Sequence, residues 1–293
     1  MSDSFNNTLI VDASDEEVEL VLDNVTISSS KTAAIVGLSA KKITINLKED
    51  TINTLSDGGN SSYDGCIFSN SELLFTGTGK LKVSGNQNEG EGIATEAQDI
   101  TFNGGIYEIT SNDDGINAGG DGATITINDG TFYINASGDG IDSNKNAIIN
   151  GGTIFVMGSD VGGDSGIDTD DGYTINGGLV VALGTDMIET PLNTSSQNTL
   201  ALTLDSAISK DNIVSIYKDG KLFSSFVAPK SFKTIIISST SLENGTYTLY
   251  YGSSNSSNYG IMTSASTKEN MIIVNGTSEF VVNKIVNYYG KGR

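Results

Sequence analysis

Acidic and amide side chains recur along the middle of the chain at a nearly constant spacing. An Asp-Gly-Ile motif places its glycine at positions 115 and 140, and variants of the motif place it at 92 and 166. Two sets of residues with side-chain oxygens lie at a constant offset from that glycine. The first set is Asp114, Asp139, Asp164 or Ser165, and Asp186. The second set lies three residues further along and is Asn117, Asp142, Asp168 and Glu189. If the chain coils with this period, each set becomes a column.

Columns of carboxylates need a compensating charge. At ~5 Å separation and an effective dielectric constant of ~20, two carboxylates repel by about 3 kcal/mol. Lys145 is the only basic residue between Lys82 and Lys210, whereas Ca²⁺ takes about six to eight oxygen ligands. The spacing therefore predicts Ca²⁺ sites, with Asp114, Asp139, Asp142, Asp164 and Asp168 as the first ligands and Asn117, Asp170, Asp171, Asp186 and Glu189 as further ones. Alternatively, the carboxylates cap strand ends in water, where screening weakens their repulsion.

The elements that would position these columns are short strands. A second motif, Asn-Gly-Gly or Asn-Asp-Gly, repeats with the same period of roughly 25 residues at Asn103, Asn128, Asn150 and Asn176. Each period holds two alternating strands separated by a glycine corner, without the i, i+3, i+4 pattern of leucine-rich repeats. We expect an all-β fold, a right-handed parallel β-helix.

The asparagines of the second motif allow two interpretations. Stacked amides could contact sugar hydroxyls at the surface. They could also form an internal ladder in which each side chain bonds to the next coil, and buried polar groups require such partners. We favour the internal ladder.

The repeat stops near Thr190–Ser196, which contains the first proline. Longer strands follow, with turn signals at 218–220 and 243–245 that predict antiparallel hairpins. We therefore divide the chain into a β-helix over residues 1–190 and a C-terminal antiparallel β-rich unit or cap over residues 191–293. A cap is expected because an exposed last coil would leave an unpaired edge.

The strand after each second motif has two distinct faces. Phe132, Ile134 and their equivalents are assigned to the core. The opposite face presents Glu108, Tyr133, Phe155 and Val181, which is too apolar a column to remain in water. Tyr133 and Phe155 could stack on sugar rings, with Lys145 as a further carbohydrate contact. Alternatively, the C-terminal unit covers this column, and we favour that interpretation.

The charge balance excludes some partners. With 36 acidic and 16 basic residues the formal net charge is −20, so the chain should repel nucleic acid and anionic membranes. No apolar run is long enough for membrane insertion. A cation is the expected partner. Cys66 is the only cysteine, which rules out an internal disulfide, and the oligomeric state is open.

Several strings along the chain resemble one family in their order and spacing. They are VELVLDNVTIS at 18–28, ITINLKEDTINTLSD at 43–57, LLFTGTGKLKVS at 73–84, the two repeated motifs, and 220–250 with its FVAPKSF segment. The chain resembles the carbohydrate-binding parallel β-helix family of cellulolytic clostridia and gut anaerobes, related in shape to pectate lyases. The resemblance implies binding of cellulose or polygalacturonate (pectin), bound calcium, and an extracellular or cell-surface location, although Met1–Asn7 is too polar for a signal peptide.

The relation to pectate lyases raises the alternative of an enzyme. A lyase needs a base for the C5 proton, usually arginine or lysine, and Arg293 is the only arginine. Lys145 is the remaining candidate, and a hydrolase could use the pairs Asp113–Asp114 or Asp170–Asp171. We expect a non-catalytic, calcium-dependent binder of plant cell-wall polysaccharide with no catalytic residues. The alternatives are a calcium-dependent polysaccharide lyase with Lys145 as base, and a structural surface adhesin without glycan specificity.

Overall fold

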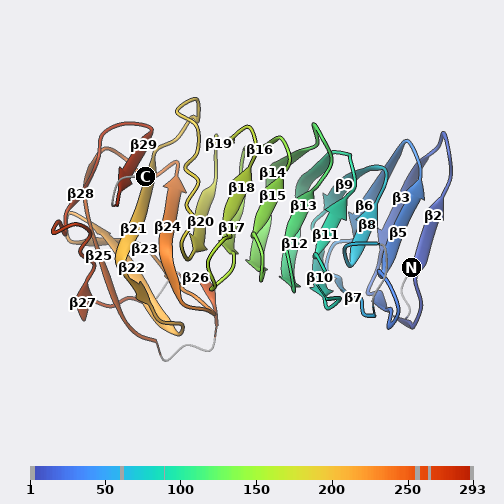
Figure 1. Cartoon of the computed structure of the whole chain (residues 1–293), viewed down its shortest axis with the longest axis horizontal. Coiled ribbons are helices and arrows are strands. Elements are labelled where there is room, and N and C mark those ends of the chain that lie inside the picture. Colours follow the sequence, from blue (N-terminus) through green and yellow to red (C-terminus); the bar gives the residue numbers. More distant parts are fainter. Residues whose placement is uncertain (1–3, 60–62, 89, 255–257, 263–264, 291–293) are drawn as a thin grey trace.

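The chain forms a stack of parallel β-coils followed by an antiparallel sheet (Figure 1). The computed structural model describes residues 4–59, 63–88, 90–254, 258–262 and 265–290, and every regular element in these ranges is a strand. No helix in these ranges could cross a membrane. The expected all-β parallel β-helix with an additional antiparallel sheet is therefore confirmed.

Three faces surround the core of the β-helix. The acidic face is a seven-stranded parallel sheet made of β2 (Leu9–Asp12), β5 (Ile35–Ser39), β8 (Ile67–Ser69), β11 (Ile93–Thr95), β13 (Ile116–Ala118), β15 (Ile141–Ser143) and β18 (Ile167–Thr169). The second face consists of β3 (Glu17–Leu22), β6 (Lys42–Leu47), β9 (Glu72–Gly77), the first halves of β12 (Ile100–Ser111) and β14 (Thr124–Asn135), β16 (Asn146–Ile149) and β19 (Tyr173–Ile175).

The third face, called the capped face below, carries the C-terminal unit at one end. It consists of β1 (Ser4–Phe5), β4 (Thr26–Ser28), β7 (Ile52–Ser56), β10 (Lys80–Gly85), the second halves of β12 and β14, β17 (Thr153–Met157) and β20 (Leu179–Gly184). β12 and β14 turn the corner between two faces without a break, and their pairing shifts register there.

The core consists of columns of like side chains. Phe132, Ile154, Val180, Ile134, Val156 and Ala182 are buried as predicted. Aromatic rings fill the middle of the stack, where Phe75 lies on Phe102 with ring centroids 4.7 Å apart and Tyr107 on Phe132 at 4.6 Å. The Tyr107 hydroxyl donates to the Gly104 carbonyl at 2.7 Å, so this buried phenol has the partner it needs.

The asparagine ladder exists, although on the surface. Asn128 donates to the Asn103 side-chain oxygen at 2.8 Å and Asn150 to that of Asn128 at 2.8 Å. Asn176 donates to Asn150 at 3.1 Å. The predicted internal position is wrong, because the first three asparagines are exposed at the corner between the second and capped faces.

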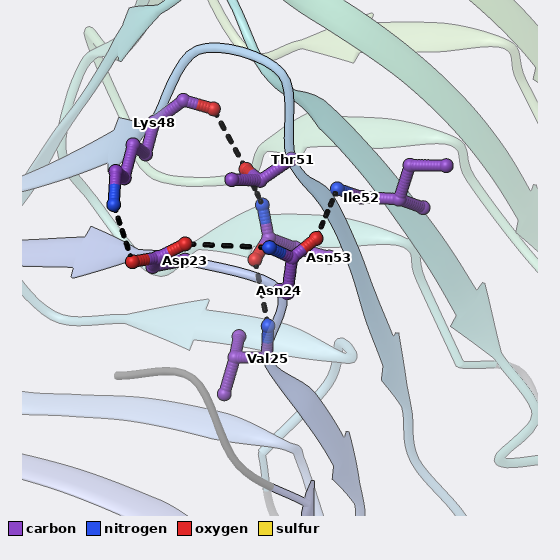
Figure 2. A network of polar contacts seen from close by, with 7 residues as sticks. All are labelled: Asp23, Asn24, Val25, Lys48, Thr51, Ile52 and Asn53. Atoms are coloured by element: carbon purple, nitrogen blue, oxygen red, sulfur yellow. Dashed lines mark hydrogen bonds and ion pairs between the residues drawn. The ribbon is translucent and has the colours of Figure 1, made fainter.

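The first coils have no glycine motif at the corner between the second and capped faces. A network of polar groups stabilises that corner instead (Figure 2). Asn53 occupies an inward position in register with Leu81, and it is fully buried. Its side-chain oxygen accepts from the backbone N–H of Val25 at 2.9 Å, and its amide donates to Thr51 Oγ1 and to the Lys80 carbonyl. All three bonds satisfy a polar group that would otherwise be costly to bury.

The C-terminal unit continues one sheet of the β-helix. β24 (Phe232–Ser239) pairs antiparallel with β20, and β21 (Thr199–Ile208) and β29 (Val286–Tyr289) extend that sheet. The edge of the last coil is thus paired on the capped face, where β20 would otherwise be an edge strand. The division into residues 1–190 and 191–293 stays a prediction.

A six-stranded antiparallel sheet completes the unit. It contains β22 (Asn212–Lys218), β23 (Lys221–Val227), β25 (Gly245–Ser253), β26 (Gly260–Met262), β27 (Asn270–Met271) and β28 (Phe280–Val282). The hairpin predicted at 218–220 joins β22 and β23, with positive φ at Asp219 and Gly220. The hairpin predicted at 243–245 is wrong, because β24 and β25 lie in different sheets.

We predict that Gly152→Ala destabilises the chain through a clash between neighbouring coils, in addition to the backbone strain of an alanine at positive φ. Gly152 has φ +92°, and a Cβ there would lie 2.6 Å from the Gly130 carbonyl oxygen of the preceding coil. Gly122 has φ +85° with no atom within 4 Å of its Cβ position, so Gly122→Ala is the matched control. Gly152→Ala should lower the free energy of unfolding by about 1–3 kcal/mol more than the control. Equal losses in chemical denaturation followed by circular dichroism would contradict this.

Candidate functional site: the acidic face

The outward side chains of the acidic face form the second predicted column. Strand pairing places Asn117, Asp142 and Asp168 in consecutive register on β13, β15 and β18. The inward neighbours Ile116, Ile141 and Ile167 are buried in the core. The pleat therefore turns the carboxylates of Asp142 and Asp168 outward on adjacent strands, which lie ~4.8 Å apart.

The first column runs along the corner just before these strands. The Asp139 backbone N–H donates to the Asp114 carboxylate at 2.6 Å, and the Ser165 N–H donates to the Asp139 carboxylate at 2.5 Å. Ser165, not Asp164, is thus the next member, and Asp164 lies beside the column, close enough to raise the pKa of Asp139.

Glu91 begins the first column, and sequence analysis did not select it. It precedes Gly92 as Asp114 precedes Gly115, so the same alignment would have identified it. The Asn117 side-chain amide donates to the carboxylates of Glu91 at 2.6 Å and Asp114 at 3.0 Å. The side-chain oxygen of Asn117 is buried without a hydrogen-bond partner in the described structure.

Glu189 ends the second column. Its carboxylate accepts from the Thr169 backbone N–H at 2.7 Å and from the Thr169 hydroxyl at 2.9 Å, and it interacts with Asp168. Of the remaining predicted ligands, Asp170 is close enough to raise the pKa of Asp142, whereas Asp171 and Asp186 are exposed at the rim.

The pKa values show how poorly this face tolerates its charge. Burial, reinforced by neighbouring carboxylates, raises the pKa of Asp114 to about 8, of Asp139 to about 7 and of Asp142 to about 6. Burial also raises the pKa of Glu189 to about 7. Full ionisation at neutral pH is therefore opposed unless a cation offsets the repulsion.

The donor set fits calcium in its chemistry. It consists of carboxylates and one unpartnered amide oxygen, the ligands that a hard cation prefers. Within the described residues, however, no three acidic, histidine or cysteine side chains already converge as a formed metal centre. Binding would require these side chains to turn toward a shared ion.

The predicted carbohydrate contacts lie on different faces. Lys145 lies at the corner between β15 of the acidic face and β16 of the second face, where its backbone carbonyl accepts the N–H of Asp171 at 2.5 Å. Tyr133 is half-buried on the capped face. Phe155 is only 2% exposed, because its ring packs against Phe226 of the C-terminal unit. This corrects the expectation for Phe155, whose ring is not available to a sugar, and confirms that the C-terminal unit covers this part of the column.

Tyr133 lines a groove that sequence analysis did not foresee. The groove has a volume of about 420 Å³ and is lined by Glu108, Thr110, Tyr133, Asn258 and Tyr259. Its two sides are more than 120 residues apart in the sequence, so only the docking of the C-terminal unit creates it.

Comparisons with known proteins agree with a glycan-related fold. A family model described as carbohydrate-binding domain-containing protein matches residues 3–279. Among solved structures, the polysaccharide lyase-like protein from C. thermocellum, a gadolinium derivative, is similar with a TM-score of 0.50 and 28% sequence identity over 60% of this chain and 77% of that one. No curated protein matches the chain.

We predict that stability without calcium falls as the pH rises from 5 to 7.5. The carboxyl groups of Asp114, Asp139 and Asp142 have folded-state pKa values above the usual ~3.9 of an unfolded aspartate. The folded state therefore binds more protons than the unfolded state across this window, and its stability decreases as they dissociate. Thermal melts in calcium-free buffer at constant ionic strength measure this.

The pH experiment has a defined upper limit and a matched pair of variants. The window ends below pH 8 because Lys230, whose pKa burial lowers to about 8, contributes with the opposite sign above it. Asp142→Asn should flatten the profile between pH 5 and 7.5, while Asp121→Asn, an exposed residue elsewhere, should not. A stability that increases with pH in the unmodified chain would refute the repulsion.

Proposed function

Because the chain belongs to the family of carbohydrate-binding domain-containing proteins, we propose that it binds plant cell-wall polysaccharide without cleaving it and that calcium is required. The observation that carries the proposal is the family match over residues 3–279, which supports a polysaccharide partner. The acidic face suggests how the binding works. An extracellular or cell-surface location is part of the same proposal, because that is where such a polymer is met.

Calcium would be held by the two columns of the acidic face. Asp139, Asp142 and Asp168 are the central ligands in this proposal, with Asp114, Asn117, Asp164, Asp170 and Glu189 beside them and Asp171 and Asp186 at the rim. The raised pKa values of this face support the need for a cation.

Polygalacturonate is the polymer that this chemistry favours. A chain of net charge −20 repels a polyanion. Bound calcium supplies positive charge that carboxylates of protein and polymer can share. Cellulose, which is neutral, gains nothing from such bridging and would have to rely on hydroxyl and aromatic contacts.

The proposal includes no catalytic residue. Lys145 is the candidate base of the lyase alternative, but its hydrogen bonds with Ser143 and Asp171 are made by its backbone and do not position its amine. Three of the four aspartates that a hydrolase would use, Asp114, Asp170 and Asp171, are also proposed as calcium ligands. Binding without cleavage therefore accounts for more of the acidic face than either reaction does.

We predict that pull-down on insoluble pectate depends on calcium and on the acidic face. Asp142→Asn/Asp168→Asn should raise the polymer concentration needed for half-maximal binding by at least tenfold, since each lost charge removes a charged ligand. Asp121→Asn/Asp129→Asn removes two exposed carboxylates elsewhere and should leave binding unchanged. The fraction of protein left in the supernatant, with calcium and with chelator, measures the effect.

The same supernatant tests the alternatives. Unsaturated or reducing sugar ends that accumulate with time would refute a non-catalytic role, and Lys145→Ala would then be the first variant to assay. Equal retention on pectate with and without calcium would refute the calcium requirement. No retention on pectate or cellulose, together with a calcium-dependent rise in melting temperature, would favour the structural adhesin.

A further inference from the structure

The central outward column of the capped face changes its chemistry from one end to the other. Strand pairing aligns Thr54, Lys82, Glu108, Tyr133, Phe155 and Val181 in consecutive coils. The apolar end is buried beneath the C-terminal unit, and Phe155 and Val181 are at most 2% exposed. The polar end stays in solvent directly beside the groove.

Two lysines stand at the polar end of that column. Lys80 and Lys82 project from the same side of β10 and both contact Glu108 on the next strand, Lys80 through Oε1 and Lys82 through Oε2 at 3.2 Å. Their side chains are 26% and 45% exposed. One carboxylate shared by two ammonium groups leaves a local positive charge on a protein whose net charge is −20.

Tyr133 provides a fixed aromatic floor next to these charges. Its ring lies parallel to Phe155, with centroids 5.7 Å apart and an interplanar angle of 6°, and the backbone of Gly260 in β26 approaches it from the C-terminal unit. Burial raises the pKa of the Tyr133 hydroxyl to about 12, so the hydroxyl stays protonated and can donate a hydrogen bond.

Tyr259 forms the opposite wall. Its side chain is 40% exposed, and its hydroxyl donates to the Asp211 carboxylate at 2.8 Å, which anchors the ring at the mouth of the groove. Thr110 and Asn258 add a hydroxyl and an amide to the lining. Aromatic surfaces next to a few polar groups match a sugar, which presents C–H faces and hydroxyl edges.

We propose that this groove binds a uronate-bearing segment of an acidic polysaccharide, with a sugar carboxylate against Lys80 and Lys82 and a sugar ring between Tyr133 and Tyr259. The inference rests on the proposed polysaccharide-binding function and adds a contact surface on a face other than the acidic one. Glu108 competes with the sugar carboxylate for both lysines, so ligand binding replaces one carboxylate partner with another. No metal ion is needed at this surface.

The competition makes two substitutions act in opposite directions. Lys80→Gln/Lys82→Gln should weaken the binding of polygalacturonate oligomers about five- to tenfold, and Glu108→Gln should strengthen it about two- to fivefold. Lys41→Gln/Lys42→Gln, which removes two charges from another part of the β-helix, is the matched control and should change nothing. Binding is measured by isothermal titration calorimetry at one calcium concentration, so that the acidic face is in the same state for every variant.

Two polymers that differ in charge distinguish the contribution of the sugar carboxylate to binding from that of the sugar ring. The effects of the lysine and Glu108 variants should disappear for highly methyl-esterified pectin, which keeps the rings but loses the charge, and should shrink at 0.5 M salt. Tyr259→Ala should weaken binding of both polymers, whereas Tyr259→Phe, which keeps the ring and loses only the hydrogen bond to Asp211, should weaken it less.

The outcomes distinguish this inference from the function on which it rests. If the unmodified chain binds polygalacturonate and the lysine, Glu108 and Tyr259 variants bind equally well, the groove is not a contact surface and the ion pairs are structural. That result would leave the proposed function intact. If the unmodified chain binds neither polymer, the proposed function fails and this inference fails with it.

Discussion

Backbone hydrogen bonding between coils is the constraint on which the rest of this structure depends. Each parallel strand pair fixes equivalent residues about 4.8 Å apart along the stack. A side chain at a given position in one coil therefore meets its counterpart in the next, whatever their chemistry. Like side chains must either gain from that contact, as Phe75 and Phe102 do, or be compensated.

The asparagine ladder and the acidic face are opposite results of that constraint. A primary amide has a donor and an acceptor, so Asn103, Asn128 and Asn150 can each bond to the next in an unbroken series. A carboxylate has acceptors only. The first acidic column thus uses backbone N–H groups of the following coil, as when Asp139 bonds to Asp114, and its remaining charge appears as raised pKa values. The positions that the fold cannot satisfy by itself are those where a cation would contribute most.

Much of this arrangement was predictable from the sequence because the repeat sets the register. The period placed Asp142 in register with Asp168 and Phe132 in the core, and both placements follow from strand alternation alone. The choice between Asp164 and Ser165 was not predictable, since the glycine-rich loop before them obscures the count. Whether the asparagines faced inward was also open, because a ladder satisfies amides equally well on either side of the chain.

The rest of the candidate site depends on how the C-terminal unit docks against the β-helix. The sequence indicates that Phe155 and Tyr133 share a column. The burial of Phe155 against Phe226 of β23 and the partial exposure of Tyr133 beside Gly260 of β26 depend on how the C-terminal unit docks. The C-terminal unit thereby performs two tasks with one contact. It buries the apolar half of the column, which stabilises the last coils, and its edge at Asn258 and Tyr259 turns the polar half into one wall of a groove. A cap required by an unpaired sheet edge can in this way determine which side chains of the β-helix are able to meet a polymer.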